Sequence, residues 1–198
     1  MTAQPIARSL DTDLRPAGFR RSGLRWNRPG EGLVDVIDLQ VAKSGGRLTV
    51  NLGVYDRLVE YVVWGERPRP FISPPDCTVQ TRLGFLIDGG DRWWPIDVDS
   101  VNQISQALLG HGLPWLLRTQ SRPAMIDFLI SRGVARDLYP LPALQLAVLY
   151  HFVGEANEST RIIEHIRSRA GGESVDHLER AIDRLNQVEI GDRAPDIS

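Results

Sequence analysis

Hydrophobic residues at the start of the chain recur with the period of a helix, and those that follow alternate with the period of strands. Ile6, Leu10 and Leu14 are four residues apart, and Pro16 and Gly18 end the helical pattern. From there on, apolar and polar residues alternate, as they do on a strand with one buried face. The change of period predicts an N-terminal helix followed by a β-sheet.

Strand-like segments follow one another as far as a pair of tryptophans. They cover residues 19–28, 33–42, 47–55 and 77–87, and a short fifth one begins at Arg92. Gly45 and Gly46 make a hairpin turn between the second and third, because glycine adopts positive φ without strain. Prolines at residues 67–75 predict an irregular connection before the fourth strand.

Most of the remaining chain has the spacing of helices. They are expected around residues 56–63, 97–110, 114–117, 123–129, 143–152, 159–168 and 175–188. This order favours an α+β fold, in which an N-terminal helix and an antiparallel β-meander of four to five strands precede a C-terminal helical bundle. We expect an α+β domain at residues 1–135 and a helical extension packed on it at 136–198. The apolar stripe at 175–185 would serve the core of this extension or, alternatively, a homodimer contact.

The composition suits a soluble intracellular protein. A chain of 198 residues, 42% hydrophobic and 24% charged, can bury a core without disulfides or metals. Cys77 is the only cysteine, which fits a reducing compartment. Residues 1–14 lack the apolar run of a secretory signal, and the apolar stretch 141–153 is shorter than the ~20 residues of a membrane span. We therefore expect a cytoplasmic protein with no membrane partner.

The distribution of charge argues against a nucleic-acid partner. The formal net charge is −2, although residues 1–50 carry eight basic and five acidic side chains. Arg20, Arg21, Arg25 and Arg28 flank Trp26, a combination that superficially suggests nucleic-acid binding. Without a wider basic surface, these arginines do not make a nucleic-acid site.

The sequence has no strong catalytic or metal-binding motif. It contains neither a phosphate-binding loop ending in Gly-Lys-Ser/Thr nor a Gly-x-Ser-x-Gly nucleophile elbow, and its four histidines lack the helical spacing of metal ligands. Cys77 is expected in the core rather than as a nucleophile. No catalytic residue, metal or cofactor is therefore predicted, and whether the protein is an enzyme stays open.

Polar residues at the outward parity of three strands form the candidate site. Gln40, Thr49, Asn51, Gln80 and Arg82 share one face if these strands are neighbours. Their amides and the guanidinium can bind a carboxylate, a phosphate or a peptide backbone. The alternative is an ordinary solvated sheet face.

Tryptophans near the strand ends are candidates for the walls of such a site. Trp26, Trp93 and Trp94 would either line a groove beside the polar patch or fill the core. The predicted ligand-binding residues are Gln40, Asn51, Arg82, Trp26 and Gln80.

Five short motifs occur in order along the strand region. They are Gly18-Phe19-Arg20-Arg21 leading to Trp26, Val36-Ile37-Asp38-Leu39-Gln40, Val50-Asn51-Leu52-Gly53, Arg82-Leu83-Gly84 and Trp93-Trp94. Over roughly residues 5–130, the chain resembles the bacterial domain of unknown function 4304 family. The resemblance implies a compact α+β domain with no established activity, and it draws attention to Gln40, Asn51 and Arg82.

Two functional hypotheses remain. The first is a non-catalytic binding module, immunity-like or regulatory, whose polar sheet face receives a protein segment or a small anionic ligand. The second is a hydrolase or transferase acting on an anionic substrate held by Arg82, with Asp38 at the right parity to act as a base. Whether the protein is a monomer or a homodimer stays open.

Overall fold

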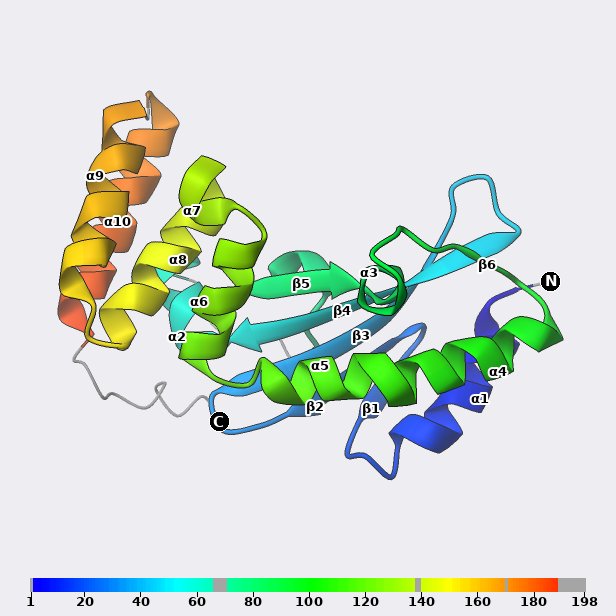
Figure 1. Ribbon diagram of the computed structural model, residues 1–198. Helices are drawn as coiled ribbons and strands as arrows, with labels where there is room; N and C mark the ends of the chain where they lie inside the picture. The colour runs from blue at the N-terminus through cyan, green and yellow to red at the C-terminus, as the bar shows by residue number, and fades with distance from the viewer. Residues whose placement is uncertain (1, 66–70, 138–139, 170, 189–198) are drawn as a thin grey trace. The chain divides into compact units, whose positions relative to one another are not determined.

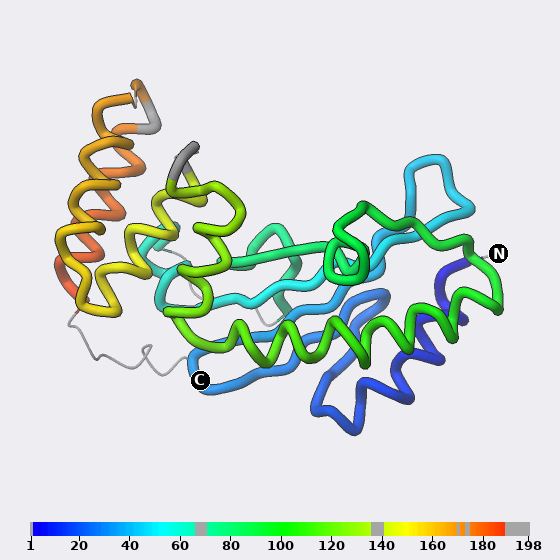
Figure 2. Tube along the Cα trace, viewed as in Figure 1, coloured from blue at the N-terminus to red at the C-terminus, as the bar shows by residue number. Residues whose placement is uncertain are grey.

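The computed structural model describes residues 2–65, 71–137, 140–169 and 171–188 (Figure 1). The chain divides by its internal contacts into two compact units. Unit 1 comprises Met1–Tyr55 and Pro70–Arg118, and unit 2 comprises Asp56–Arg69 and Thr119–Ser198. Each unit is therefore built from two separate stretches of chain, as the trace in Figure 2 shows. The domain boundary expected between residues 135 and 136 stays a prediction.

Unit 1 contains a six-stranded sheet in which the first five strands lie in the order β1-β2-β3-β4-β5. The strands are β1 (Arg20–Ser22), β2 (Arg25–Pro29), β3 (Leu33–Val41), β4 (Arg47–Asp56), β5 (Val79–Arg82) and β6 (Trp94–Pro95). β6 pairs with the start of β4, next to the stretch that pairs with β5. The antiparallel sheet between an N-terminal helix and later helices confirms the predicted α+β fold.

Two of the expected strands differ from the structure. Residues 19–28 form the hairpin β1–β2 rather than one strand, with Gly23 at a φ of 63° in the turn. The strand expected at 77–87 ends at Arg82, and α3 (Leu83–Ile87) follows. A Cβ on Gly84 would lie 2.5 Å from both Arg92 N and Gly90 O, so α3 depends on a glycine that lets the following backbone approach closely.

The inner face of the sheet carries Trp26 and Ile37, which are paired across β2 and β3. Helix α1 (Gln4–Leu14) covers it, and Trp26 Nε1 donates a hydrogen bond of 3.0 Å to Asp11 of this helix. Burial alone would raise the pKa of Asp11, but hydrogen bonds from Arg15 and Trp26 hold it below its usual value. The carboxylate therefore stays charged at neutral pH and anchors α1 to the sheet.

A second helical segment also packs on the inner face. It consists of α4 (Val98–Ala107), a π-helical turn (Leu108–Gly112) and α5 (Leu113–Arg118). A Cβ on Gly112 would lie 3.4 Å from side chains of both Leu52 and Leu83, which shows how closely the turn approaches the sheet. The helix expected to stop at Gly110 instead continues, because its buried side keeps packing through the turn (Figure 1).

Unit 2 is helical. Its helices are α2 (Arg57–Trp64), α6 (Arg122–Ser131), α7 (Val134–Asp137), α8 (Pro140–Phe152), α9 (Ala156–Arg169) and α10 (Glu173–Gln187). Residues 143–149 of α8 are all buried, as expected for a helix that is apolar nearly all round. Leu178 and Leu185 of α10 are also buried within the unit, so the apolar stripe contributes to its core.

Both ends of α2 are held by charged side chains of unit 2. At its start, the Asp56 carboxylate accepts hydrogen bonds from backbone N–H groups of the first turn and from Arg122 Nε at 2.9 Å. At its end, Arg184 of α10 donates to the carbonyl oxygens of Val62 and Val63 at 2.8 and 2.9 Å. These contacts satisfy terminal backbone groups that a short helix leaves unpaired.

The close approach at Gly84 predicts a large difference between two glycine substitutions. Gly84→Ala should lower the free energy of unfolding by about 2 kcal/mol or more, because backbone atoms have to move. In the matched control Gly110→Ala, the added Cβ meets nothing within 4 Å, and stability should be unchanged or slightly raised. Urea denaturation of both variants measures this, and equal effects would contradict the packing assigned to α3.

Candidate functional site

The outer face of the sheet is the one opposite Trp26 and Ile37, and it holds most of the predicted site residues. Asn51 pairs with Arg82 across β4 and β5, and Gly53 pairs with Gln80. Asn51 Nδ2 also donates to Gln40 Oε1 at 3.0 Å, which brings in β3. Gln40, Asn51, Gln80 and Arg82 therefore share one face of three neighbouring strands, as the strand parity predicts.

Trp26 does not lie with these residues. It is fully buried on the inner face, where it bonds to Asp11, so it cannot line a site beside Gln40. Trp94 pairs with Leu48 and is also buried. Strand parity separates the two faces of β2, but it does not say which face the helices cover. The burial of Trp26 could therefore not be predicted from parity alone.

Trp93 is the tryptophan that lies beside a predicted site residue. Its ring centroid is 5.4 Å from the Arg82 guanidinium carbon. Trp93 Nε1 donates to Asp91 Oδ2 at 3.2 Å, and Arg82 Nη1 donates to the same oxygen at 2.5 Å. Arg82 is thus oriented by both an aromatic ring and a carboxylate.

Five polar residues, one from each of β1 to β5, cross the outer face in a line. Ser22 pairs with Arg25, Arg25 with Asp38, and Asn51 with Arg82. Asn51 Nδ2 lies 3.4 Å from Asp38 Oδ2, and this contact connects the residues on β3 and β4. We call Ser22, Arg25, Asp38, Asn51 and Arg82 the polar row.

Hydrogen bonds order the middle of the polar row. Arg25 Nε donates to Asp38 Oδ1 at 3.2 Å, so both Asp38 oxygens accept hydrogen bonds from the row. Arg25 was not predicted as a site residue, although its parity with Asn27 could have placed it on the outer face. Asp91 could not be found in this way, because it reaches Arg82 from a loop rather than from a strand.

Thr49 has the same parity as Asn51 but does not contribute an accessible group. Its side chain is fully buried, and its hydroxyl has no hydrogen-bond partner in the structure. The surface of the predicted patch is therefore formed by the Gln40, Asn51 and Gln80 amides and the Arg82 guanidinium, and not by the Thr49 hydroxyl.

Residues 71–78 cover the part of the outer face that adjoins the polar row at Asn27 of β2. Asn27, two residues from Arg25, binds this segment through both polar atoms of its side chain. Its Nδ2 donates to Ile72 O at 3.1 Å, and its Oδ1 accepts from Ile72 N at 2.6 Å. All these atoms are buried, so the paired amide holds the segment on β2.

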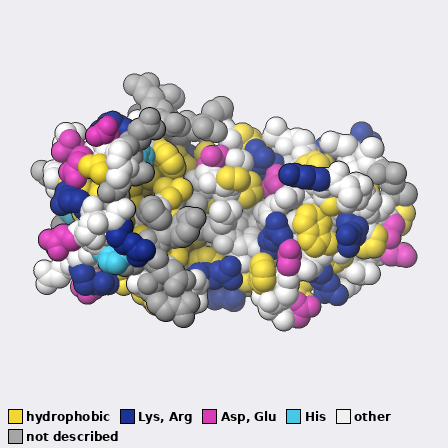
Figure 3. Space-filling view, turned by 90° about the horizontal axis from the view of Figure 1, so that it is seen from above, with side chains coloured by type: hydrophobic (Ala, Val, Ile, Leu, Met, Phe, Trp, Pro, Cys, Tyr) yellow, Lys and Arg dark blue, Asp and Glu magenta, His cyan; other side chains and the backbone are white. Residues whose placement is uncertain are grey.

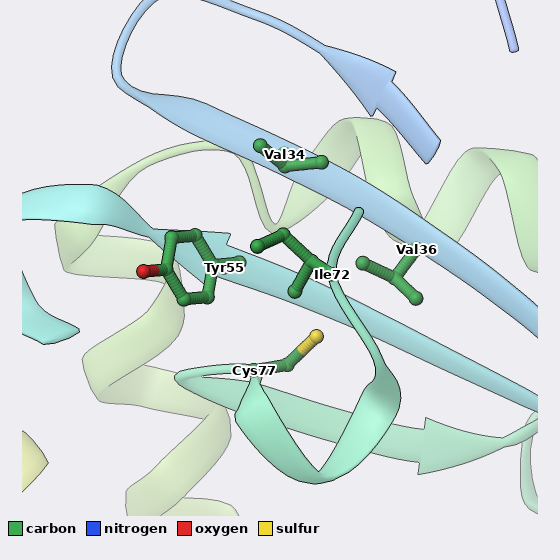
Figure 4. Close-up of a cluster of buried hydrophobic side chains, with 5 residues drawn as sticks. All are labelled: Val34, Val36, Tyr55, Ile72 and Cys77. Atoms are coloured by element: carbon green, nitrogen blue, oxygen red, sulfur yellow. The ribbon is translucent and has the colours of Figure 1, made fainter. Parts of the chain in front are cut away.

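Beneath this segment, the outer face is apolar. Ile72 and Cys77 gather with Val34, Val36 and Tyr55 in a buried cluster (Figure 4). A Cβ on Gly53 of β4 would lie 2.5 Å from Cys77 Sγ, so the strand needs glycine where the segment crosses it. Cys77 is thus a core residue, as expected. Residues 67–70 of the proline-rich connection lie outside the described residues.

The part of the chain that the structure describes contains no group of three or more His, Cys, Asp or Glu side chains that could hold a metal ion. Within the same residues, no helix is long and apolar enough to cross a membrane.

The fold and this face define an α+β protein. One face of its antiparallel sheet is partly covered by residues 71–78 and carries the polar row beside this cover. A family model described as a domain of unknown function (DUF4304) matches residues 10–118, and the protein belongs to this family. The match ends where unit 1 ends and contains every residue of the polar row. No curated protein and no solved structure matches the chain.

Removing the side chain that holds the covering segment should expose Cys77. In Asn27→Ala, the Ile72 backbone groups lose their partners, which costs about 1–3 kcal/mol and raises the open fraction of the segment about tenfold or more. The rate at which a thiol reagent modifies the single cysteine measures this opening. Asn102→Ala on the exposed side of α4 is the control and should leave the rate unchanged. Equal rates in both variants would contradict the role of Asn27.

Arg82→Ala should leave the fold intact. The Arg82 side chain is 31% exposed, and its ion pair with Asp91 lies at the surface. We expect the free energy of unfolding to change by less than about 1 kcal/mol in chemical denaturation. A loss several times larger would show that Arg82 is structural rather than available to a ligand.

Proposed function

We propose that unit 1 is a non-catalytic binding module, immunity-like or regulatory, in the cytoplasm of a bacterium. Its polar row would bind a protein segment or a small anionic ligand. The observation that carries this proposal is the pair of arginines in the row, each held in place by a carboxylate of the same chain. A ligand meets guanidinium groups whose orientation is already set, so binding costs less side-chain entropy.

Both arginines keep donors for a ligand. The contact of Arg25 with Asp38 uses Nε, and that of Arg82 with Asp91 uses Nη1. A guanidinium has five N–H groups, so several remain on each. Their side chains are 34% and 31% exposed, which leaves these groups within reach of a carboxylate or phosphate.

The contacts of Asp38 favour binding over the alternative, a hydrolase or transferase with an anionic substrate on Arg82. A general base directs a free lone pair at the substrate proton. Each Asp38 oxygen already uses one of its two lone pairs to accept a hydrogen bond, from Arg25 or from Asn51, which leaves fewer for a substrate. The surface charge likewise supports a protein or small-molecule ligand over nucleic acid, because basic and acidic side chains are interspersed on the face in Figure 3.

Native mass spectrometry of the full-length protein, gently purified from cells that express it, tests the proposal. We expect a bound species on the wild-type protein that is lost from Arg82→Gln. Arg8→Gln removes the same charge from an exposed position on α1 and should keep the bound species. A species that survives in Arg82→Gln, or a wild-type protein with nothing bound, would contradict tight binding at the polar row.

A further inference from the structure

We propose that the occupant of the polar row is an extended acidic segment of another protein, with two carboxylates four residues apart. One carboxylate would bind Arg25 and the other Arg82. This inference rests on the binding function proposed above and adds the chemistry and spacing of the ligand.

The distance between the two arginines selects an extended ligand. Arg25 and Arg82 lie in one row on β2 and β5, with β3 and β4 between them. Three strand spacings place their backbones about 14 Å apart. Arg25 is held by Asp38 and Arg82 by Asp91, so each guanidinium has its own carboxylate and we expect a phosphate or a single carboxylate to engage one of them at a time. An extended peptide advances about 3.3 Å per residue, so residues four apart span about 13 Å and project to the same side.

The charge of the outer face complements an acidic segment. Arg20 pairs with Asn27, and Arg47 has the parity of Asn51, so both join Arg25 and Arg82 on this face. Their positive charges are opposed by Asp38 in the sheet and by Asp91, which pairs with Arg82. Asp76 of the covering segment, which accepts a hydrogen bond from Ser73 N, is a third carboxylate on this side of the sheet. Four arginines against three carboxylates leave a small excess of positive charge, which favours an acidic partner over a basic one.

The middle of the row adds a second element of selectivity. Asp38 and Asn51 lie between the two arginines, and Asp38 presents a negative charge there. The ligand residue midway between the two carboxylates faces these side chains, since alternate residues of an extended chain point the same way. An acidic residue at that position would be repelled by Asp38, whereas a glutamine or serine could hydrogen-bond to Asn51.

Trp93 provides a direct readout of occupancy. Its indole N–H donates to the Asp91 oxygen that also binds Arg82. A carboxylate that binds the remaining donors of Arg82 shares the guanidinium with Asp91 and therefore changes the environment of this N–H group. The indole signal in a ¹H–¹⁵N NMR spectrum of the full-length protein, assigned by Trp93→Phe, reports this change.

The experiment compares acetylated, amidated peptides of glycine, serine and two glutamates, with the glutamates either four or two residues apart. We expect the four-residue spacing to bind about tenfold more tightly, the contribution of one additional charge-assisted contact. A third glutamate midway between the two should weaken binding. Arg25→Gln and Arg82→Gln should each abolish the advantage of the longer spacing, and Arg8→Gln should preserve it.

The outcomes separate this inference from the binding function. Equal affinity for both spacings, with binding still lost in Arg82→Gln, would overturn the two-point ligand and leave the binding function standing. Inorganic phosphate that shifts the Trp93 signal at the same concentration as the best peptide would point to a small anion and would also overturn it. If millimolar peptide and phosphate both leave the Trp93 signal unchanged, the inference and the binding function fail together.

Discussion

The paired hydrogen bonds between Asn27 and the backbone of Ile72 decide how the outer face of the sheet is used. They fix residues 71–78 over one part of this face, where the segment buries Val34, Val36 and Tyr55. A buried backbone segment needs partners for its polar groups, and an amide side chain supplies both a donor and an acceptor. Among the described residues, the polar row lies on the part of the outer face beside this cover.

The polar row lies at the border between these two parts. Asn27 is two residues from Arg25 along β2, and Gly53, which Cys77 touches, is two residues from Asn51 along β4. Side chains two residues apart on a strand are neighbours on one face. The covering segment therefore lies next to the row along its length on these strands, and its fixed position helps to define where a ligand would bind.

The sequence predicted much of the candidate site because strand parity is a local property. Gln40, Asn51, Gln80 and Arg82 could be placed on one face once alternation along each strand was recognised, and the family resemblance drew attention to three of them. Arg25 and Asp91 were missed for different reasons. Alternation along β2 puts Arg25 on the face of Asn27 but does not say which face of β2 continues the polar face of β3, and Asp91 approaches Arg82 through a loop whose path depends on Gly84.

By itself, the sequence determined the fold class, the positions of most helices and strands and the polar parity of β3, β4 and β5, since all of these follow from local periodicity and turn residues. Only the tertiary structure decided that Trp26 faces α1, that residues 71–78 cover part of the outer face, and that five residues from five strands form one row. These features depend on strand register and on contacts between residues distant in the chain, such as Asn27 with Ile72. Local hydrophobic patterns carry no information about either of them.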